Sequence, residues 1–287
     1  MQDTITTIYC VCADVLKVQG FEEDKQRRFT DAEVMTVPLV AALYHQGNHA
    51  LTRRFLHQHG YTRNTLSASR FCRRLAGVAQ SAWQMVFAVL SQVFKAHNKS
   101  GVYAVDSYPI AVCANCRIKR CALFEVQEHG ALRGYQASKK QYFYGFKVHL
   151  LVTAQGQPIE FFLSEGSLHD LEGLKRLPLD LPLDLPPGST LYGDKAYMDQ
   201  HEEWLLQDAA GVRFLPLTRS NAKKPLPPCL VYLGLVYLAH IGRQQVETAF
   251  SLIDRKMPKH IHAVSPQGFL LKLQAAVIAF AFDRLIA

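Results

Sequence analysis

The sequence predicts an α/β protein in which a mixed sheet flanked by helices follows an all-α, helix-turn-helix-like region. The first observation is periodicity, because residues 1–98 have the apolar spacing of helices, whereas short apolar runs typical of strands begin at residue 102. The second is element order, because the later part alternates strands and helices, which buries both faces of a sheet. Two domains are expected, 1–98 and 99–287.

The helical region has recognisable start and stop signals. Thr30 and Glu33 have the spacing of a capping box, and the helix that they open should end near Gly47. Three further helices are expected, over residues 50–59, from 65 to 75, and over 79–95. Short helices followed by an Arg-rich helix fit a helix-turn-helix-like unit, although three-helix bundles that do not bind DNA have the same pattern.

The second region contains five expected strands. They cover residues 102–107, 143–153, 158–164, 189–193 and 212–216. The turn at 154–157 joins two of them as a hairpin. Helices are expected over 170–176, 199–210, 237–255 and 266–286, with a Pro-rich loop before residue 189. A right-handed crossover would place the strand at 189–193 parallel to the strand at 102–107.

Charge is distributed unevenly along the chain. The formal net charge is +8, and residues 34–105 contain no Asp or Glu. The same stretch contains Arg53, Arg54, Arg63, Arg70, Arg73, Arg74, Lys95 and Lys99. A solvated basic face would normally mix both signs, so the pattern favours a surface that binds the phosphate backbone of a nucleic acid.

The cysteines and apolar runs indicate a soluble, cytoplasmic protein. There are seven cysteines, an odd number, and the N-terminus lacks a secretory signal, so the thiols are expected to be reduced. The longest apolar run, at 229–239, is too short to span a bilayer. Cys113, Cys116 and Cys121, with His129, form an alternative zinc site, but a single pair with CxxC spacing is a weak signal.

Three carboxylates lie in separate and unusual contexts. Asp106 lies in the apolar run 102–108, Asp194 ends the run 190–194, and Glu247 lies in a segment with helical periodicity. A charge at the end of a buried strand costs free energy unless it is paired or binds a metal. Two Asp and one Glu supply the oxygen ligands that Mg²⁺ or Mn²⁺ prefers. The alternatives are local caps for the two Asp residues and a helical ion pair between Glu247 and Arg243.

Five segments in this order resemble the DDE transposases of bacterial insertion sequences, whose catalytic domain has a ribonuclease-H-like fold. They are residues 104–109 (Ala-Val-Asp-Ser-Tyr-Pro), 134–140, 144–151, 192–197 (Tyr-Gly-Asp-Lys-Ala-Tyr) and 243–250. The chain is most similar to the insertion-sequence 982 family, over nearly its whole length. Each motif alone is weak, whereas five in the correct order are specific.

The resemblance implies a two-metal active site. Asp106, Asp194 and Glu247 would hold two Mg²⁺ ions, for which Mn²⁺ can substitute, with Asp106 bridging them. Arg243 would orient Glu247 or contact the scissile phosphate. Relatives with a Tyr-Arg-Glu-Lys signature have Tyr where this chain has His240 and Lys where it has Asp254, so only the Arg-Glu half is retained.

The resemblance also implies the partners. They are double-stranded DNA, as terminal inverted repeats and as target, and further copies of the chain in a homodimer or larger assembly at the bacterial nucleoid, without a membrane. Basic residues near Asp106 would flank the DNA channel, although each could equally lie on a solvated strand face; they are Lys139, Lys140 and Lys147. His169 and Asp170 could form a catalytic pair, but residues 167–170 fit a helix start better.

The sequence therefore predicts a transposase that binds the ends of its element, cleaves phosphodiesters and joins 3′ ends to target DNA. One alternative is a ribonuclease-H-like nuclease that has no strand-transfer activity. Another is a non-catalytic, domesticated DNA-binding protein, against which the presence of Asp106, Asp194 and Glu247 argues.

Overall fold

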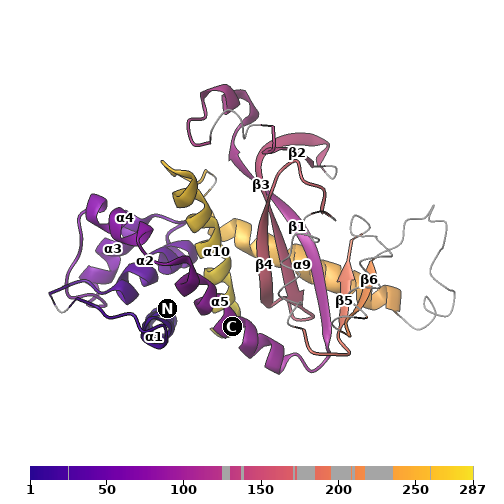
Figure 1. Cartoon of the computed structure of the whole chain (residues 1–287), viewed down its shortest axis with the longest axis horizontal. Helices are drawn as coiled ribbons and strands as arrows, with labels where there is room; N and C mark the ends of the chain where they lie inside the picture. The colour runs from indigo at the N-terminus through magenta and orange to yellow at the C-terminus, as the bar shows by residue number, and fades with distance from the viewer. Residues whose placement is uncertain are drawn as a thin grey trace. The chain divides into compact units, whose positions relative to one another are not determined.

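The structure, a computed structural model, forms two compact units (Figure 1). It describes residues 1–24, 26–124, 130–136, 139–170, 172, 185–194, 208, 211–216, 235–258 and 260–286, of which residues 216 and 235–243 are described by their backbone alone. The helical unit comprises Met1–Ser91 and Leu252–Ala287, and the sheet unit comprises Gln92–Ser251. The domain boundary predicted between residues 98 and 99 stays a prediction.

The helical unit is built around α2. Its elements are α1 (Gln2–Val18), α2 (Asp31–Tyr44), α3 (His49–Gln58), α4 (Ala68–Ala76), most of α5 (Gln80–His97), the end of α9 (Leu235–Lys256) and α10 (Pro266–Ile286). Every residue of α2 from Val34 to Ala42 is buried, which is typical of a helix covered on all sides. Helices α1, α3, α4 and α10 pack against it. The C-terminal helix α10 therefore shares a core with the N-terminal helices.

The predicted helix start at Thr30 is confirmed, whereas the helix expected from residue 65 begins at Ala68. Thr30 and Glu33 form the complete capping box, in which the Glu33 N–H donates to Thr30 Oγ1 at 3.1 Å. Asn48 and Ser67 accept from backbone N–H groups at the starts of α3 and α4. Residues 59–67 separate α3 from α4, whereas a helix-turn-helix turn usually has three or four residues. The helix-turn-helix interpretation stays a prediction.

The sheet unit contains the predicted mixed sheet. Its strands are β1 (Val102–Cys113), β2 (Arg133–Gln136), β3 (Gln141–Thr153), β4 (Pro158–Glu165), β5 (Thr190–Gly193) and β6 (Arg213–Pro216). The order is β2-β3-β1-β5-β6, and β4 also pairs with β3. Strand β1 is antiparallel to β3 and parallel to β5, as the crossover argument predicted, and β3 and β4 form the predicted hairpin.

Two features of this unit were not predicted. The strand expected to end at residue 107 continues through Pro109 to Cys113. Pro109 lies opposite Lys147 of β3, and the described part of β5 pairs with β1 no further than Val105. The short strand β2 and the 3₁₀ helix η1 (Asn115–Arg120) have too few residues for a periodic signal. The helices expected at 170–176 and 199–210 fall almost entirely outside the described residues.

Helix α9 crosses the sheet in Figure 1, and α10 follows it in the chain. Both were predicted, over 237–255 and 266–286, and both are confirmed at Leu235–Lys256 and Pro266–Ile286. No helix among the described residues is long and apolar enough to cross a membrane.

Gly145 of β3 lies close to the backbone of β1 and to the residues that flank β2 and β4. Its N–H donates to Leu132 O at 2.8 Å, and its carbonyl accepts from the Gly166 N–H at 2.9 Å. A methyl group added at Gly145 would lie 2.0 Å from Ile110 O and 2.9 Å from Val112 N. Because these are backbone atoms of β1, they cannot rotate away. Glycine is therefore required at this point of the 144–151 segment.

Gly145→Ala is expected to lower the free energy of unfolding by about 1–3 kcal/mol or more, because the added methyl group overpacks a site bounded by backbone. Urea denaturation measures the change. Gly130→Ala is the matched control, since a methyl group there meets no atom within 4 Å. The two variants should differ clearly in stability, and equal stability would contradict this packing argument.

Candidate functional site

The pairing of β1 with β5 brings Asp106 and Asp194 to neighbouring positions. The strands run parallel and in register, with Val102 opposite Thr190 and Val105 opposite Gly193 at the last pair. Asp106 and Asp194 each follow that last pair directly. Because side chains alternate along strands, residues at equivalent positions of in-register parallel strands point to the same face. Both Asp residues are half-buried, directly after the end of the β1–β5 pairing.

The helix that carries Glu247 packs on the same face of the sheet. Asp106 and Tyr108 share a face of β1 by strand alternation, and the Tyr108 ring stacks on Phe250 of α9, with centroids 5.3 Å apart and planes 23° apart. Phe250 and Val246 are buried, whereas Glu247, one turn before Phe250, is exposed. The fold therefore brings all three predicted carboxylates to one side of the sheet.

The three carboxylates do not form a closed metal cage. Among the described residues, no group of three His, Cys, Asp or Glu side chains is arranged to hold a metal ion. The donor chemistry nevertheless fits Mg²⁺ or Mn²⁺, because all three side chains offer carboxylate oxygens. The structure places Asp106 and Asp194 at neighbouring positions directly after the last β1–β5 pair, and Glu247 lies on α9, which contacts β1 through the Tyr108–Phe250 stack. The side chain of Arg243 lies outside the description, and its backbone lies one turn before Glu247 on α9.

The opposite face of β1 carries a polar cluster that the sequence did not reveal. Asp170 Oδ1 accepts hydrogen bonds from Ser107 Oγ and from Lys147 Nζ, each at 2.9 Å. Lys147 was predicted to contact DNA, and its ammonium group is instead bound to Asp170 and to Leu168 O. His169 is exposed. In the β1–β3 register Lys147 lies opposite Pro109, which places Lys147 on the same face of the sheet as Ser107. This position could have indicated that Lys147 belongs to the polar cluster.

The predicted DNA-binding arginines fall into two groups. Arg54, Arg63, Arg70 and Arg73 are exposed. Arg53 is buried, donates to Leu66 O and lies 5.0 Å from the centroid of the Phe71 ring. Arg74 donates to Phe29 O and pairs with Asp31 at the start of α2. These two arginines hold the helical unit together, so the four exposed ones remain the better candidates. Lys139 and Lys140, just before β3, are also exposed.

The cysteine cluster does not form a zinc site in the part of the chain that the structure describes. Burial, followed by the neighbouring thiols of Cys121 and Cys116, raises the pKa of Cys113 to about 11. His129, the fourth residue of the alternative zinc site, lies outside the described residues.

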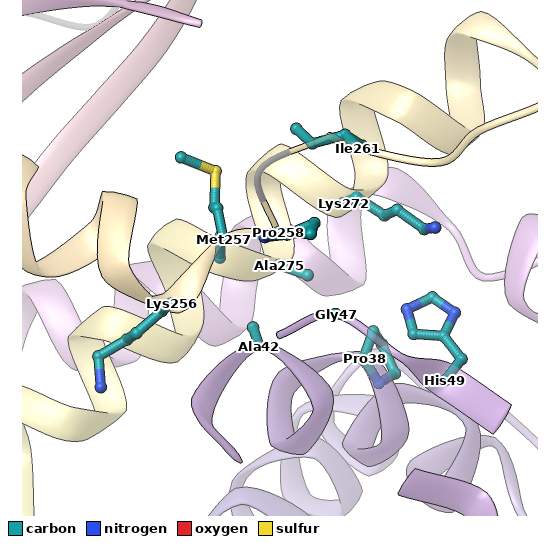
Figure 2. A pocket seen from close by; sticks show the side chains of 11 residues that line it. Pro38, Ala42, Gly47, His49, Lys256, Met257, Pro258, Ile261, Lys272 and Ala275 are labelled. Carbon is teal, nitrogen blue, oxygen red and sulfur yellow. The ribbon is translucent and has the colours of Figure 1, made fainter. Parts of the chain in front are cut away.

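A small cavity of about 20 Å³ in the helical unit is lined by apolar side chains and three basic ones (Figure 2). Figure 2 shows His49 and Lys272 at one end and Lys256 at the other. Burial lowers the pKa of His49 to about 4, and the charges of Lys272 and Arg53 act in the same direction. Lys256 pairs with Asp283 at 3.1 Å. The cavity has room for little more than one water molecule, so it is no substrate site.

The family described as "Transposase DDE domain" matches residues 96–231. The matched segment contains Asp106 and Asp194 and ends before α9 and Glu247. No curated protein matches the chain. One solved structure, the Mos1 mariner paired end complex with Mn, is 10% identical over 84% of this chain and 82% of that chain, with a TM-score of 0.22. A TM-score this low does not indicate a shared fold.

Over residues 96–231 the chain is therefore similar to the DDE domains of transposases. This match does not distinguish the insertion-sequence 982 family from others or establish a bacterial origin. The roles assigned to individual residues also stay predictions.

His49 makes the stability of the helical unit pH-dependent. Its pKa is about 4 in the folded chain and has an ordinary value of 6.5 when exposed, so it stays neutral in the fold while the unfolded chain takes up a proton below pH 6.5. Its contribution to stability is therefore present above pH 6.5 and is lost as the pH falls toward 4, by up to about 1.4 kcal/mol per pH unit.

His49→Gln is expected to flatten this dependence. Urea denaturation at pH 7, 6 and 5 measures the slope of unfolding free energy against pH, which should decrease by about one proton in the variant. His149, whose pKa burial also lowers to about 4, supplies a background slope that both proteins share. Identical slopes would mean that His49 is already solvated in the folded chain.

Proposed function

We propose that this chain is a DNA transposase that binds the terminal inverted repeats of its element, cleaves phosphodiesters and joins the 3′ ends to target DNA. The observation that carries the proposal is the adjacency of Asp106 and Asp194, each directly after the last β1–β5 pair, within the segment that matches a transposase family. An acid with a purely structural role there gains nothing from a second acid beside it, because like charges repel. Such a pair is useful where a cation binds.

The proposed roles follow from the positions of the side chains. Asp106 and Asp194 would hold the divalent ions, and Glu247 would complete the ligand set from α9, the helix anchored by the Tyr108–Phe250 stack. When bound, two Mg²⁺ or Mn²⁺ ions stabilise the charge that develops on the attacking and leaving oxygens of a phosphodiester. Arg243, one turn before Glu247, would orient that carboxylate or contact the scissile phosphate.

The DNA partners divide between the two units. The exposed arginines of the helical unit, led by Arg70 and Arg73 on α4, would contact the phosphates of the terminal repeats. Lys139 and Lys140 would contact DNA near the carboxylates. Two ends must be joined to one target, so we expect a homodimer or larger assembly on DNA. The central strand β1 between antiparallel β3 and parallel β5 supports a ribonuclease-H-like catalytic domain, as in bacterial elements of the insertion-sequence 982 family.

Asp106→Asn, Asp194→Asn and Glu247→Gln should each reduce cleavage by about 10²–10³-fold or more, because several kcal/mol of transition-state stabilisation by metal ions is lost. The assay incubates labelled DNA carrying the element's ends with Mg²⁺ or Mn²⁺, and EDTA should abolish nicking. Binding of the same DNA, measured by mobility shift, should change little. The exposed Asp208, as Asp208→Asn, is the control. An Asp106→Asn protein that cleaves DNA as fast as wild type would contradict the proposal.

Replacing Arg70 and Arg73 together by alanine should weaken binding of end DNA and lower the salt slope of log K by about 0.9 for each phosphate that the variant no longer neutralises. Both side chains are exposed on α4, so the fold should be retained. Lys17→Ala, which removes an exposed positive charge from α1, is the matched control and should leave the slope unchanged. An unaltered slope in the double variant would place the DNA-binding surface elsewhere.

A further inference from the structure

The polar cluster behind β1 joins three segments that are distant in sequence. One carboxylate oxygen, Asp170 Oδ1, accepts from Ser107 Oγ of β1 and from Lys147 Nζ of β3, each at 2.9 Å. Lys147 Nζ also donates to Leu168 O at 2.8 Å. Two strands of the sheet are thereby tied to the residues that follow β4. We call Ser107, Lys147 and Asp170 the β1 clasp.

The side chains of the clasp are largely shielded from solvent, so their hydrogen bonds restrain the backbone strongly. The Lys147 side chain is 13% exposed and the Asp170 side chain 22%. Charge-assisted hydrogen bonds in such surroundings are shorter and stronger than neutral ones. Removal of one partner leaves the other charge half-buried and unpaired, which is costly. A bridge of this kind therefore fixes the backbone positions that it joins.

His149 lies next to the clasp, on the same face of the sheet. It is fully buried, stacks on Phe162 with ring centroids 4.3 Å apart and planes 3° apart, and its Nε2 pairs with Ser164 Oγ at 2.8 Å. It lies opposite Ser107 in the β1–β3 register, so it borders the clasp on the same face. Burial lowers its pKa, and the imidazole is neutral at neutral pH. Lys147 is therefore the cation that balances Asp170.

Ser107 connects the clasp to the carboxylate on the other face of the sheet. Its side chain points to the face opposite to that of Asp106, while its backbone N–H donates to Asp106 Oδ1 at 2.8 Å. At Asp106, β1 pairs with Leu150 of β3, whereas the described part of β5 pairs with β1 no further than Val105. The clasp adds a side-chain restraint to the β1–β3 ladder at the residue immediately after Asp106.

We propose that Asp170 and Lys147, acting through Ser107, are positioning residues that hold the Asp106 carboxylate beside Asp194. This inference rests on the proposed function. It gives Lys147 an internal role in place of the DNA contact expected from the sequence. Hydrogen-bonding partners behind a metal ligand typically change metal affinity or activity by 10–100-fold when removed. The clasp should therefore act on metal binding and the chemical step, and not on the affinity for DNA.

Asp170→Asn is the first test, because it keeps the shape of the side chain and removes the charge that pairs with Lys147. The half-saturating Mn²⁺ concentration for cleavage should rise by about 10–100-fold, with a similar loss of rate at fixed Mn²⁺. Binding of end DNA in EDTA should stay within about twofold of wild type. Direct Mn²⁺ titration of the full chain by electron paramagnetic resonance, without DNA, measures the same weakening independently of activity.

Ser107→Ala and Ser107→Thr separate positioning from folding. The alanine variant removes the hydroxyl donor from a half-buried site and should behave as a milder Asp170→Asn, whereas the threonine variant keeps the donor and should restore Mn²⁺ affinity. Thermal unfolding of each variant shows whether it is folded. Asp208→Asn, an exposed acid of the same unit, is the matched control and should leave both titrations unchanged.

Two outcomes would overturn the inference. One is wild-type Mn²⁺ affinity and rate in folded Asp170→Asn and Ser107→Ala proteins. The other is a Lys147→Met variant that loses DNA binding but keeps its Mn²⁺ affinity, which would return Lys147 to a DNA-binding role. Failure of the proposed function is distinguishable, because wild type would then cleave in no metal and Asp106→Asn would leave Mn²⁺ binding unchanged.

Discussion

The four-residue parallel pairing of β1 with β5 is the interaction on which the proposed site depends. It fixes which residues are neighbours, and it ends at Val105 and Gly193, immediately before the two Asp residues. A register shift of one residue would turn one of the two side chains to the opposite face of the sheet. The register is protected by its apolar surroundings, because Tyr103, Ala104, Leu191 and Tyr192 are all buried. Hydrophobic burial in these short strands thus sets the geometry of the charged groups.

Much of this arrangement could be predicted from the sequence. The capping box at Thr30, the hairpin at 154–157 and the strands around Asp106 and Asp194 have strong local signals, and each is present. The crossover rule correctly made β5 parallel to β1, because handedness depends on chain chirality more than on particular side chains. The same rule allowed Asp106 and Asp194 to lie side by side. The register that places them there was not predictable, since apolar strands allow several alignments with similar burial.

Side-chain partners were the part that sequence could not provide. Arg53, Arg74 and Lys147 look equivalent to the exposed basic residues in a charge pattern, yet each donates to partners in its own unit. An acid-free stretch says nothing of acids elsewhere in the chain, and Arg74 pairs with Asp31, which lies just before the stretch begins. The packing of α10 on α2 could not be predicted for a similar reason, because an apolar helix face does not specify which element it packs against.

The three carboxylates are held by interactions of different stiffness, and this difference bears on how metal would bind. Asp106 lies within β1 and Asp194 directly follows β5, and the β1–β5 backbone ladder restricts their separation. Glu247 is exposed on a helix anchored by aromatic stacking, which restrains position less tightly than hydrogen-bond ladders do. Without a cation, three carboxylates brought together would repel one another. In the proposed site a divalent cation would offset this repulsion, with Asp106 and Asp194 positioned by the sheet and Glu247 by α9.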